Sequence, residues 1–197
     1  MEFNEVIKKR RMTREFSNKE VQYCDIEAII EAGSLAPTCN HLRQWDFVII
    51  DDRMIINILA KCVKNYSSSA SKPKNPYEDM CNYAFPRQQS MIEEAQFIIL
   101  PIIKENSLYK ATNMFSLMHF ADTWCAIENM FLKATELGLG CSMHVPSMEE
   151  QNNIFNLIKC KKGYALTCII GIGYPSETAY YPEEIEFDRK RIHRNRW

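Results

Sequence analysis

The chain has 197 residues, of which 46% are hydrophobic and 25% charged, with a formal net charge of −1. This length is sufficient for one well-filled core, so we expect a single domain spanning residues 1–197. The balanced charge excludes a general attraction to nucleic acid or to a membrane surface. The eight cysteines form no Cys-x-x-Cys pair, and the charged N-terminus does not resemble a signal peptide. We therefore expect no metal site and a cytoplasmic protein with reduced thiols.

The positive charge is concentrated near the two ends of the chain. One cluster contains Lys8, Lys9, Arg10, Arg11 and Arg14, and the other contains Arg189, Lys190, Arg191, Arg194 and Arg196. Guanidinium groups match phosphate oxygens in bidentate geometry. Two interpretations remain open: both ends bind one anion, or both are solvated surface charges.

The first third of the chain predicts helix, helix, strand and helix, over residues 3–10, 25–35, 45–50 and 51–63. Asp25 is expected to be the N-cap of the second helix, and Asp51-Asp52 is expected to open the fourth element. The sequence APTCNH, from Ala36 to His41, interrupts the second helix and predicts a loop.

Residues 65–86 are rich in Ser, Lys, Asn and Pro and predict an exposed loop. A lid over a site and an inert insertion are equally compatible with this composition. Residues 86–94 predict a helix, and Ala95–Ile103 form a nearly continuous apolar run. Such a run predicts a central strand that is covered on both faces.

Residues 113–137 predict a long helix that is apolar around most of its circumference. A helix of this kind must be covered on most sides, so we expect it in the core and consider that it also packs against a second copy of the chain. Gly138 is expected to end the helix, and Gly140 to let a ligand lie against the backbone, because it has no Cβ.

The last quarter predicts a helix, a strand and a tail. Ser147 and Glu150 form the pattern of a capping box for a helix that runs to Lys159. Residues 165–173 predict a second buried strand, and residues 179–197 an extended C-terminal tail. Alternating helices and strands around a few central strands indicate a layered α/β or α+β domain.

Four segments occur in a characteristic order. They are RRMTREF at Arg10–Phe16, APTCNHLRQWDFVII at Ala36–Ile50, DTWCAIENMFLKATELGLG at Asp122–Gly140 and IIGIGYPSE at Ile169–Glu177. Together they resemble the nitroreductase family of FMN-dependent oxidoreductases. The resemblance implies an α+β fold with a central, mostly antiparallel sheet flanked by helices. It also implies a homodimer, with the long core helix and two FMN sites at the dimer interface.

The resemblance also implies which residues bind FMN. The flavin phosphate would be held by the N-terminal arginines and the basic tail, the ring by the segment after Gly140, and its pyrimidine edge by the residue at position 88. The Ala36–His41 loop would reach the flavin of the partner subunit. The implied cofactor-binding residues are Arg10, Arg11, Arg14, Pro37, Thr38, Cys39, His41, Gln88, Cys141, Ser142, Met143, His144, Lys190 and Arg191.

The implied activity is the transfer of hydride from NADH or NADPH, through flavin N5, to a small-molecule electron acceptor such as a nitroaromatic or a quinone, in a ping-pong cycle. The flavin carries the chemistry, so no catalytic side chain is expected. Met12 departs from the family pattern and removes a hydroxyl contact to the phosphate, which neighbouring arginines can replace. His41 and Arg43-Gln44 also depart from the pattern; they change the polar lining of the flavin pocket and leave the substrate open. The alternatives are a specialised flavin reaction, for example reductive dehalogenation, and a non-catalytic FMN-binding dimer.

Overall fold

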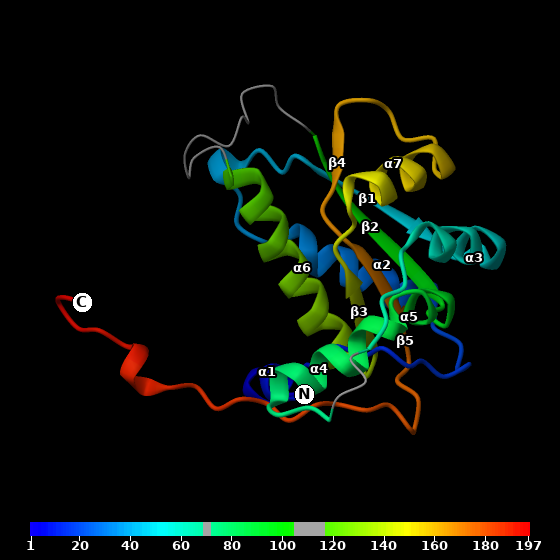
Figure 1. Cartoon of the computed structure of the whole chain (residues 1–197). Helices are drawn as coiled ribbons and strands as arrows, with labels where there is room; N and C mark the ends of the chain where they lie inside the picture. The colour runs from blue at the N-terminus through cyan, green and yellow to red at the C-terminus, as the bar shows by residue number, and fades with distance from the viewer. Residues whose placement is uncertain (69–71, 105–116) are drawn as a thin grey trace.

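The computed structural model describes residues 1–68, 72–104 and 117–197, and Figure 1 shows helices on both faces of one sheet. The helices are α1 (Phe3–Lys9), α2 (Tyr23–Ser34), α3 (Arg53–Cys62), α4 (Pro76–Ala84), α5 (Ser90–Glu93), α6 (Met118–Glu136) and α7 (Met148–Leu157). The strands are β1 (Trp45–Ile50), β2 (Phe97–Lys104), β3 (Gly140–His144), β4 (Tyr164–Leu166) and β5 (Ile169–Gly173). Short 3-10 turns occur at Cys39–His41, Phe85–Arg87 and Arg189–Arg191.

The strand order is β1-β2-β5-β3, with β4 also beside β2, and the strand pairs are antiparallel. This arrangement confirms the predicted α+β class. The strand predicted over residues 165–173 is instead divided into β4 and β5. The division faces Pro101 of β2, whose carbonyl accepts a hydrogen bond from the Thr167 peptide N–H (3.0 Å). Proline has no N–H to donate, so a continuous ladder cannot pass this point.

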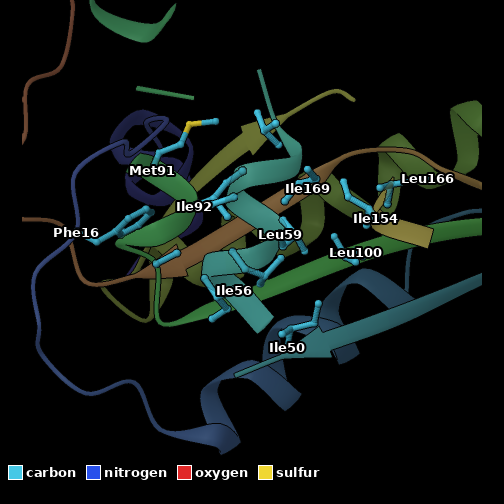
Figure 2. Packing of buried hydrophobic residues seen from close by; sticks show 14 of the residues in the cluster. Phe16, Ile50, Ile56, Leu59, Met91, Ile92, Leu100, Ile154, Leu166 and Ile169 are labelled. Carbon is cyan, nitrogen blue, oxygen red and sulfur yellow. The ribbon is translucent and has the colours of Figure 1, made fainter. Parts of the chain in front are cut away.

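Strand β2 supplies side chains to two cores, because successive residues of a strand point to opposite faces of the sheet. Ile98, Leu100 and Ile102 belong to the core that α3, α5 and α7 cover, which Figure 2 shows from close by. Phe97 and Ile99 belong to the core beneath α2 and α6. The prediction of a central strand covered on both faces is therefore confirmed.

Two of the three predicted helix starts are confirmed. Asp52 accepts hydrogen bonds from the first-turn peptide groups of α3 at 2.8 and 3.2 Å. Ser147 and Glu150 form the predicted capping box of α7. The prediction for Asp25 is wrong, because α2 begins at Tyr23 and Gln22 occupies the N-cap position without a side-chain hydrogen bond. Asp25 lies in the first turn, where a negative charge still interacts favourably with the helix dipole.

Helix α6 ends in a Schellman motif, in which Leu139 N–H donates to Ala134 C=O (2.8 Å) and Gly138 N–H donates to Thr135 C=O (3.0 Å). Gly138 has φ +77°, a conformation that glycine adopts without steric cost. The predicted stop signal is thus confirmed. The predicted start of the helix, over residues 113–116, lies outside the described residues.

The segment predicted as a loop over residues 65–86 contains a helix, α4. The prediction missed it because the polar composition obscured a helix-start signal. Asn75 caps the helix by accepting a hydrogen bond from Glu78 N–H at 2.9 Å, and Pro76 occupies the first turn. Proline is favoured there because its missing N–H has no helical partner in any case.

One face of α6 is left uncovered by the residues that the structure describes. Leu117, Met118 and Phe120 are exposed at its beginning, and Leu42, which follows the Cys39–His41 turn, is exposed as well. The C-terminal tail is also largely exposed, and Figure 1 shows it extending away from the rest of the protein. Within the described residues, no helix is long and apolar enough to cross a bilayer.

Candidate functional site

The arginine segment Arg10–Arg14 is fixed against strand β3. Met12 forms a parallel bridge with Cys141, and Thr13 N–H donates to the Cys141 carbonyl at 2.8 Å. The Thr13 side chain is buried and packs so closely on Gly140 that a Cβ at that position would collide with it. The absence of a Cβ at Gly140 thus allows the close approach of Thr13, whereas the predicted approach of a ligand to this glycine stays a prediction.

Three arginines of this segment line one cavity of about 310 Å³. Its other walls come from the beginning of α4 and from the first part of the C-terminal tail. The lining consists of Arg10, Arg11, Met12, Arg14, Pro76, Tyr77, Met80, Tyr181, Pro182, Glu183, Glu184 and Ile185. The cavity thus combines concentrated positive charge with aromatic and apolar surface, as a site for a phosphate-bearing aromatic ligand requires.

The side chain of Arg14 is partly buried near a second guanidinium group. Its guanidinium carbon lies 5.9 Å from the centre of the Tyr83 ring, which Arg87 also approaches, at 4.2 Å. Burial lowers the pKa of Arg14, as does the charge of Arg87, while Tyr83 opposes the shift. The Arg87 charge is itself balanced by Glu15, whose Oε1 lies 2.9 Å from Arg87 Nε. An anion in the cavity would therefore stabilise the charged form of Arg14, which burial and the charge of Arg87 disfavour.

The tail contributes acidic rather than basic residues to this cavity. Glu184 Oε1 lies 3.2 Å from Arg11 Nε. Lys190 and Arg191 were predicted to join the N-terminal arginines, but within one chain they lie in an exposed 3-10 turn beyond the cavity. The reason is the direction of the tail, whose apolar residues Ile185 and Phe187 remain exposed and do not turn it back onto its own chain.

The four residues predicted after the Gly-Leu-Gly sequence form strand β3. Cys141, Ser142 and His144 are buried, and Met143 is half-buried. Burial raises the pKa of the Cys141 thiol to about 12, so this cysteine is unsuited to act as a thiolate nucleophile near neutral pH. Because the Cys141 carbonyl faces the open edge of the sheet towards Thr13, the peptide groups of Met143 face the same edge.

His144 and Gln88 are in direct contact, although 56 positions separate them in the sequence. His144 Nδ1 lies 2.7 Å from Gln88 Oε1, and His144 Nε2 lies 3.2 Å from Glu150 Oε2. The structure thus places Gln88 at the end of β3, beside the segment predicted to contact the flavin ring. The side chain of Glu150, predicted only as part of a capping box, has a second contact here.

The predicted loop residues Pro37, Thr38, Cys39 and His41 lie at the other end of α6. Cys39 N–H donates to Asp122 Oδ2, in the first part of that helix, at 2.9 Å. Asn40, His41 and Arg43 have φ values of 53°, 54° and 44°, a concentration of backbone strain that is typical of ligand-contacting loops. The loop contacts α6 at Asp122, whereas Arg10 Nε lies 3.8 Å from Glu128 Oε1 near the middle of that helix. Within one chain, none of the loop residues lines the arginine cavity.

Sequence reasoning missed the residues that support Arg14. Tyr83 and Arg87, one helical turn apart, lie far in the sequence from Arg14 and Glu15, and the ring of Tyr83 also packs edge-on against Tyr180 of the tail at 5.0 Å. No sequence pattern connects Tyr83 and Arg87 to the arginine segment. The one available signal was the adjacency of Glu15 to the arginine segment, which makes it a candidate for pairing with a cation.

Residues 7–174 match the sequence model of the Nitroreductase family. A candidate NADH dehydrogenase/NAD(P)H nitroreductase of Archaeoglobus fulgidus is 24% identical, with 95% of this chain and 94% of that protein covered. An iodotyrosine deiodinase of Haliscomenobacter hydrossis is also 24% identical, with 97% and 87% covered. A solved structure of an oxidised iodotyrosine deiodinase, bound to FMN and 3-iodo-L-tyrosine, is 18% identical over all of both chains, with a TM-score of 0.75.

Proposed function

This chain belongs to the nitroreductase family, and we propose that it is an FMN-dependent NAD(P)H oxidoreductase that works as a homodimer. The observation that carries the proposal is the cavity into which Arg10, Arg11 and Arg14 converge. The substrate would be a small-molecule electron acceptor, such as a nitroaromatic or a quinone.

The residues of the chain fit FMN. Arg10, Arg11 and Arg14 would hold its phosphate, because guanidinium groups provide several donors in a fixed planar arrangement. The aromatic ring system would extend along the open edge of β3, where the peptide groups of Met143 are directed outwards. A phosphate would also displace the carboxylate of Glu184 from Arg11, an exposed pair that costs little to break.

The uncovered face of α6 supports a homodimer. A contiguous exposed apolar surface on a folded chain marks an interaction site, and here it includes Leu117, Met118 and Phe120. In a dimer, the strained Pro37–His41 loop of one subunit would meet the arginine cavity of the other. The tail residues Lys190 and Arg191 would likewise reach the phosphate only through the assembly of two chains.

The flavin, when bound, supplies the capacity to accept hydride from NADH or NADPH and to pass electrons to the acceptor. The protein side chains then bind and orient. Arg14 and its neighbours neutralise the phosphate, while β3 offers backbone donors and acceptors to the ring. Cys141 takes no part as a nucleophile because its thiol is buried and its pKa is raised.

Paired titrations with FMN and riboflavin test the phosphate site. Charge-assisted hydrogen bonds contribute about 1.5–3 kcal/mol each, so Arg14→Gln is expected to weaken FMN binding about 10- to 100-fold and to leave riboflavin binding nearly unchanged. Lys161→Gln, which removes an exposed charge next to β4, is the control. Equal affinity of the wild-type protein for FMN and riboflavin would contradict the proposal.

Reduction of bound FMN by NADH and NADPH, followed by stopped flow, tests the enzymatic part. Fast loss of the flavin absorbance supports an oxidoreductase, whereas tight binding without reduction indicates a non-catalytic flavin-binding dimer. Reductive dehalogenation is the second candidate, favoured by the similarity to an iodotyrosine deiodinase over nearly the whole chain. Release of iodide from 3-iodo-L-tyrosine by the chemically reduced protein would establish that reaction.

A further inference from the structure

A buried polar cluster made of His144, Gln88 and Glu150 lies at the end of β3. The amide of Gln88 has one orientation that satisfies its neighbours, because Gln88 Nε2 donates to the Ala84 carbonyl at 2.7 Å. Its Oε1 atom therefore faces His144 Nδ1, at 2.7 Å. An amide oxygen only accepts hydrogen bonds, so Nδ1 must carry a hydrogen.

The other ring nitrogen of His144 faces a carboxylate. Glu150 Oε1 accepts from Lys64 N–H at 2.7 Å, and Glu150 Oε2 accepts from Ser147 N–H at 2.6 Å and lies 3.2 Å from His144 Nε2. Burial alone would raise the pKa of Glu150, but these peptide hydrogen bonds and His144 together lower it below its ordinary value. Independently of His144, both oxygens of Glu150 accept peptide N–H groups, as those of an ionised carboxylate do. An ionised carboxylate has no hydrogen to donate to Nε2.

The remaining surroundings agree with an ionised Glu150. Three elements pack against this cluster: α7 supplies Glu150, the turn before α5 supplies Gln88, and the end of α3 supplies the Cys62 thiol and the Lys64 peptide group. Burial raises the pKa of Cys62, and the charge of Glu150 raises it further. The exposed ammonium group of Lys64 is paired with Glu149 at 2.8 Å rather than with this cluster.

We propose that His144 is a doubly protonated imidazolium, held by Gln88 and Glu150, that places a fixed positive charge at the flavin-ring end of β3. The inference rests on the proposed function for the location of the ring. His144 would stabilise the reduced flavin electrostatically. Negative charge that the flavin gains on reduction would then lie near a cation in a site of low dielectric constant.

The positive charge of His144 has fewer stabilising contacts than the negative charge of Glu150. The Glu150 carboxylate accepts two peptide N–H groups and lies in the first turn of α7, where the helix dipole stabilises a negative charge. The imidazolium, by contrast, meets a single neutral oxygen at Nδ1. The pair therefore presents its positive end at β3, because the imidazolium belongs to the strand and the carboxylate to α7.

Nitrogen NMR of the ¹⁵N-histidine-labelled protein without FMN tests the charge directly. Both ring nitrogens of His144 are expected to carry protons at pH 7.5, with the resonances assigned through their loss in His144→Gln. Glu150→Gln should convert His144 to a neutral ring with one proton. A single ring proton in the folded wild-type protein would overturn the proposal, and circular dichroism establishes that each variant is folded.

Affinities for oxidised and reduced FMN then test the effect on the cofactor. His144→Gln is expected to weaken the binding of reduced FMN relative to oxidised FMN by about tenfold, equivalent to a shift of about 30 mV for a two-electron couple. The control is Lys64→Gln, which removes an exposed charge nearby but keeps the peptide N–H that Glu150 accepts. Bound FMN with an unchanged affinity ratio overturns this inference alone. Failure of the wild-type protein to bind FMN overturns the proposed function as well.

Discussion

The two faces of the central sheet are covered to different extents. On one face, α3, α5 and α7 enclose side chains such as Ile56, Leu59 and Ile154, which are fully buried. On the other face, α2 and α6 cover a second core, but α6 leaves Met118 and Phe120 exposed on its far side. We call these the closed face and the open face.

We propose that the closed face is complete within one chain and that a second copy of the chain covers the open face. The proposed flavin site likewise has one part that a single chain assembles and other parts that would meet only between two chains. The Gln88–His144–Glu150 cluster is assembled within one chain, where His144 contacts both Gln88 and Glu150. The Pro37–His41 loop contacts the first part of α6 and does not line the arginine cavity, and we propose that the two meet only across two subunits.

The largest expected effect concerns the closed face. Leu59→Ala removes a fully buried side chain from this core and is expected to lower the free energy of unfolding by about 2–5 kcal/mol. The loss should not depend on protein concentration if the closed face is complete within one chain. Denaturant unfolding at several concentrations measures it, and Met54→Ala, which changes an exposed side chain of the same helix, is the control. A loss in Leu59→Ala that vanished at high concentration would contradict the comparison.

The open face should respond through association instead. Phe120→Asp places a charge in the exposed apolar surface of α6 and is expected to weaken the dimer by about 2 kcal/mol, about 30-fold, because buried aromatic residues are frequent hot spots. Sedimentation measures the dissociation constant. Met54→Asp introduces the same charge on the closed face and should leave association unchanged. If Met54→Asp dissociated the dimer and Phe120→Asp did not, the two faces would have been assigned the wrong way round.

A smaller effect distinguishes the helix starts on the two faces. Asp52→Ala removes the N-cap of α3 on the closed face and is expected to cost about 1 kcal/mol of unfolding free energy. Asp25→Ala on α2 removes only a first-turn charge, whose interaction with the helix dipole contributes about 0.3–1 kcal/mol. Thermal unfolding in low and high salt separates them, because salt screens the dipole interaction and leaves most of the cap intact. An equal loss in both variants at high salt would show that Asp25 has a capping role.

The elements that the sequence predicted well are those specified by local chemistry. The strand at Trp45–Ile50, the cap at Asp52, the capping box at Ser147 and the stop at Gly138 each depend on residues within one turn or one strand. Helix α4 was missed because its start signal lies in a polar segment. The division of β4 from β5 was missed because it depends on Pro101, which belongs to a different strand, β2, and lies far from β4 and β5 in the sequence.

The site was less predictable for the same reason. The arginine segment was recognisable because its residues are adjacent, but its supports Tyr83 and Arg87 are distant in sequence. The direction of the tail, and hence the separation of Lys190 from Arg14, depends on what covers Ile185 and Phe187. Their exposure in one chain is not a property that local sequence specifies.

The smallest expected effect is a pH dependence on the closed face. The hydrogen bonds from Lys64 and Ser147 and the contact with His144 outweigh burial and lower the pKa of Glu150 in the folded protein. The stabilisation from ionised Glu150 is therefore complete above the ordinary glutamate pKa and is lost as the pH falls through the lowered folded value. Between pH 7 and pH 3 the wild-type protein should lose more stability than Glu150→Gln, which has no carboxylate to protonate. Unfolding free energies measured at each pH test this, and parallel losses in the two proteins would show that the fold does not lower the pKa of Glu150.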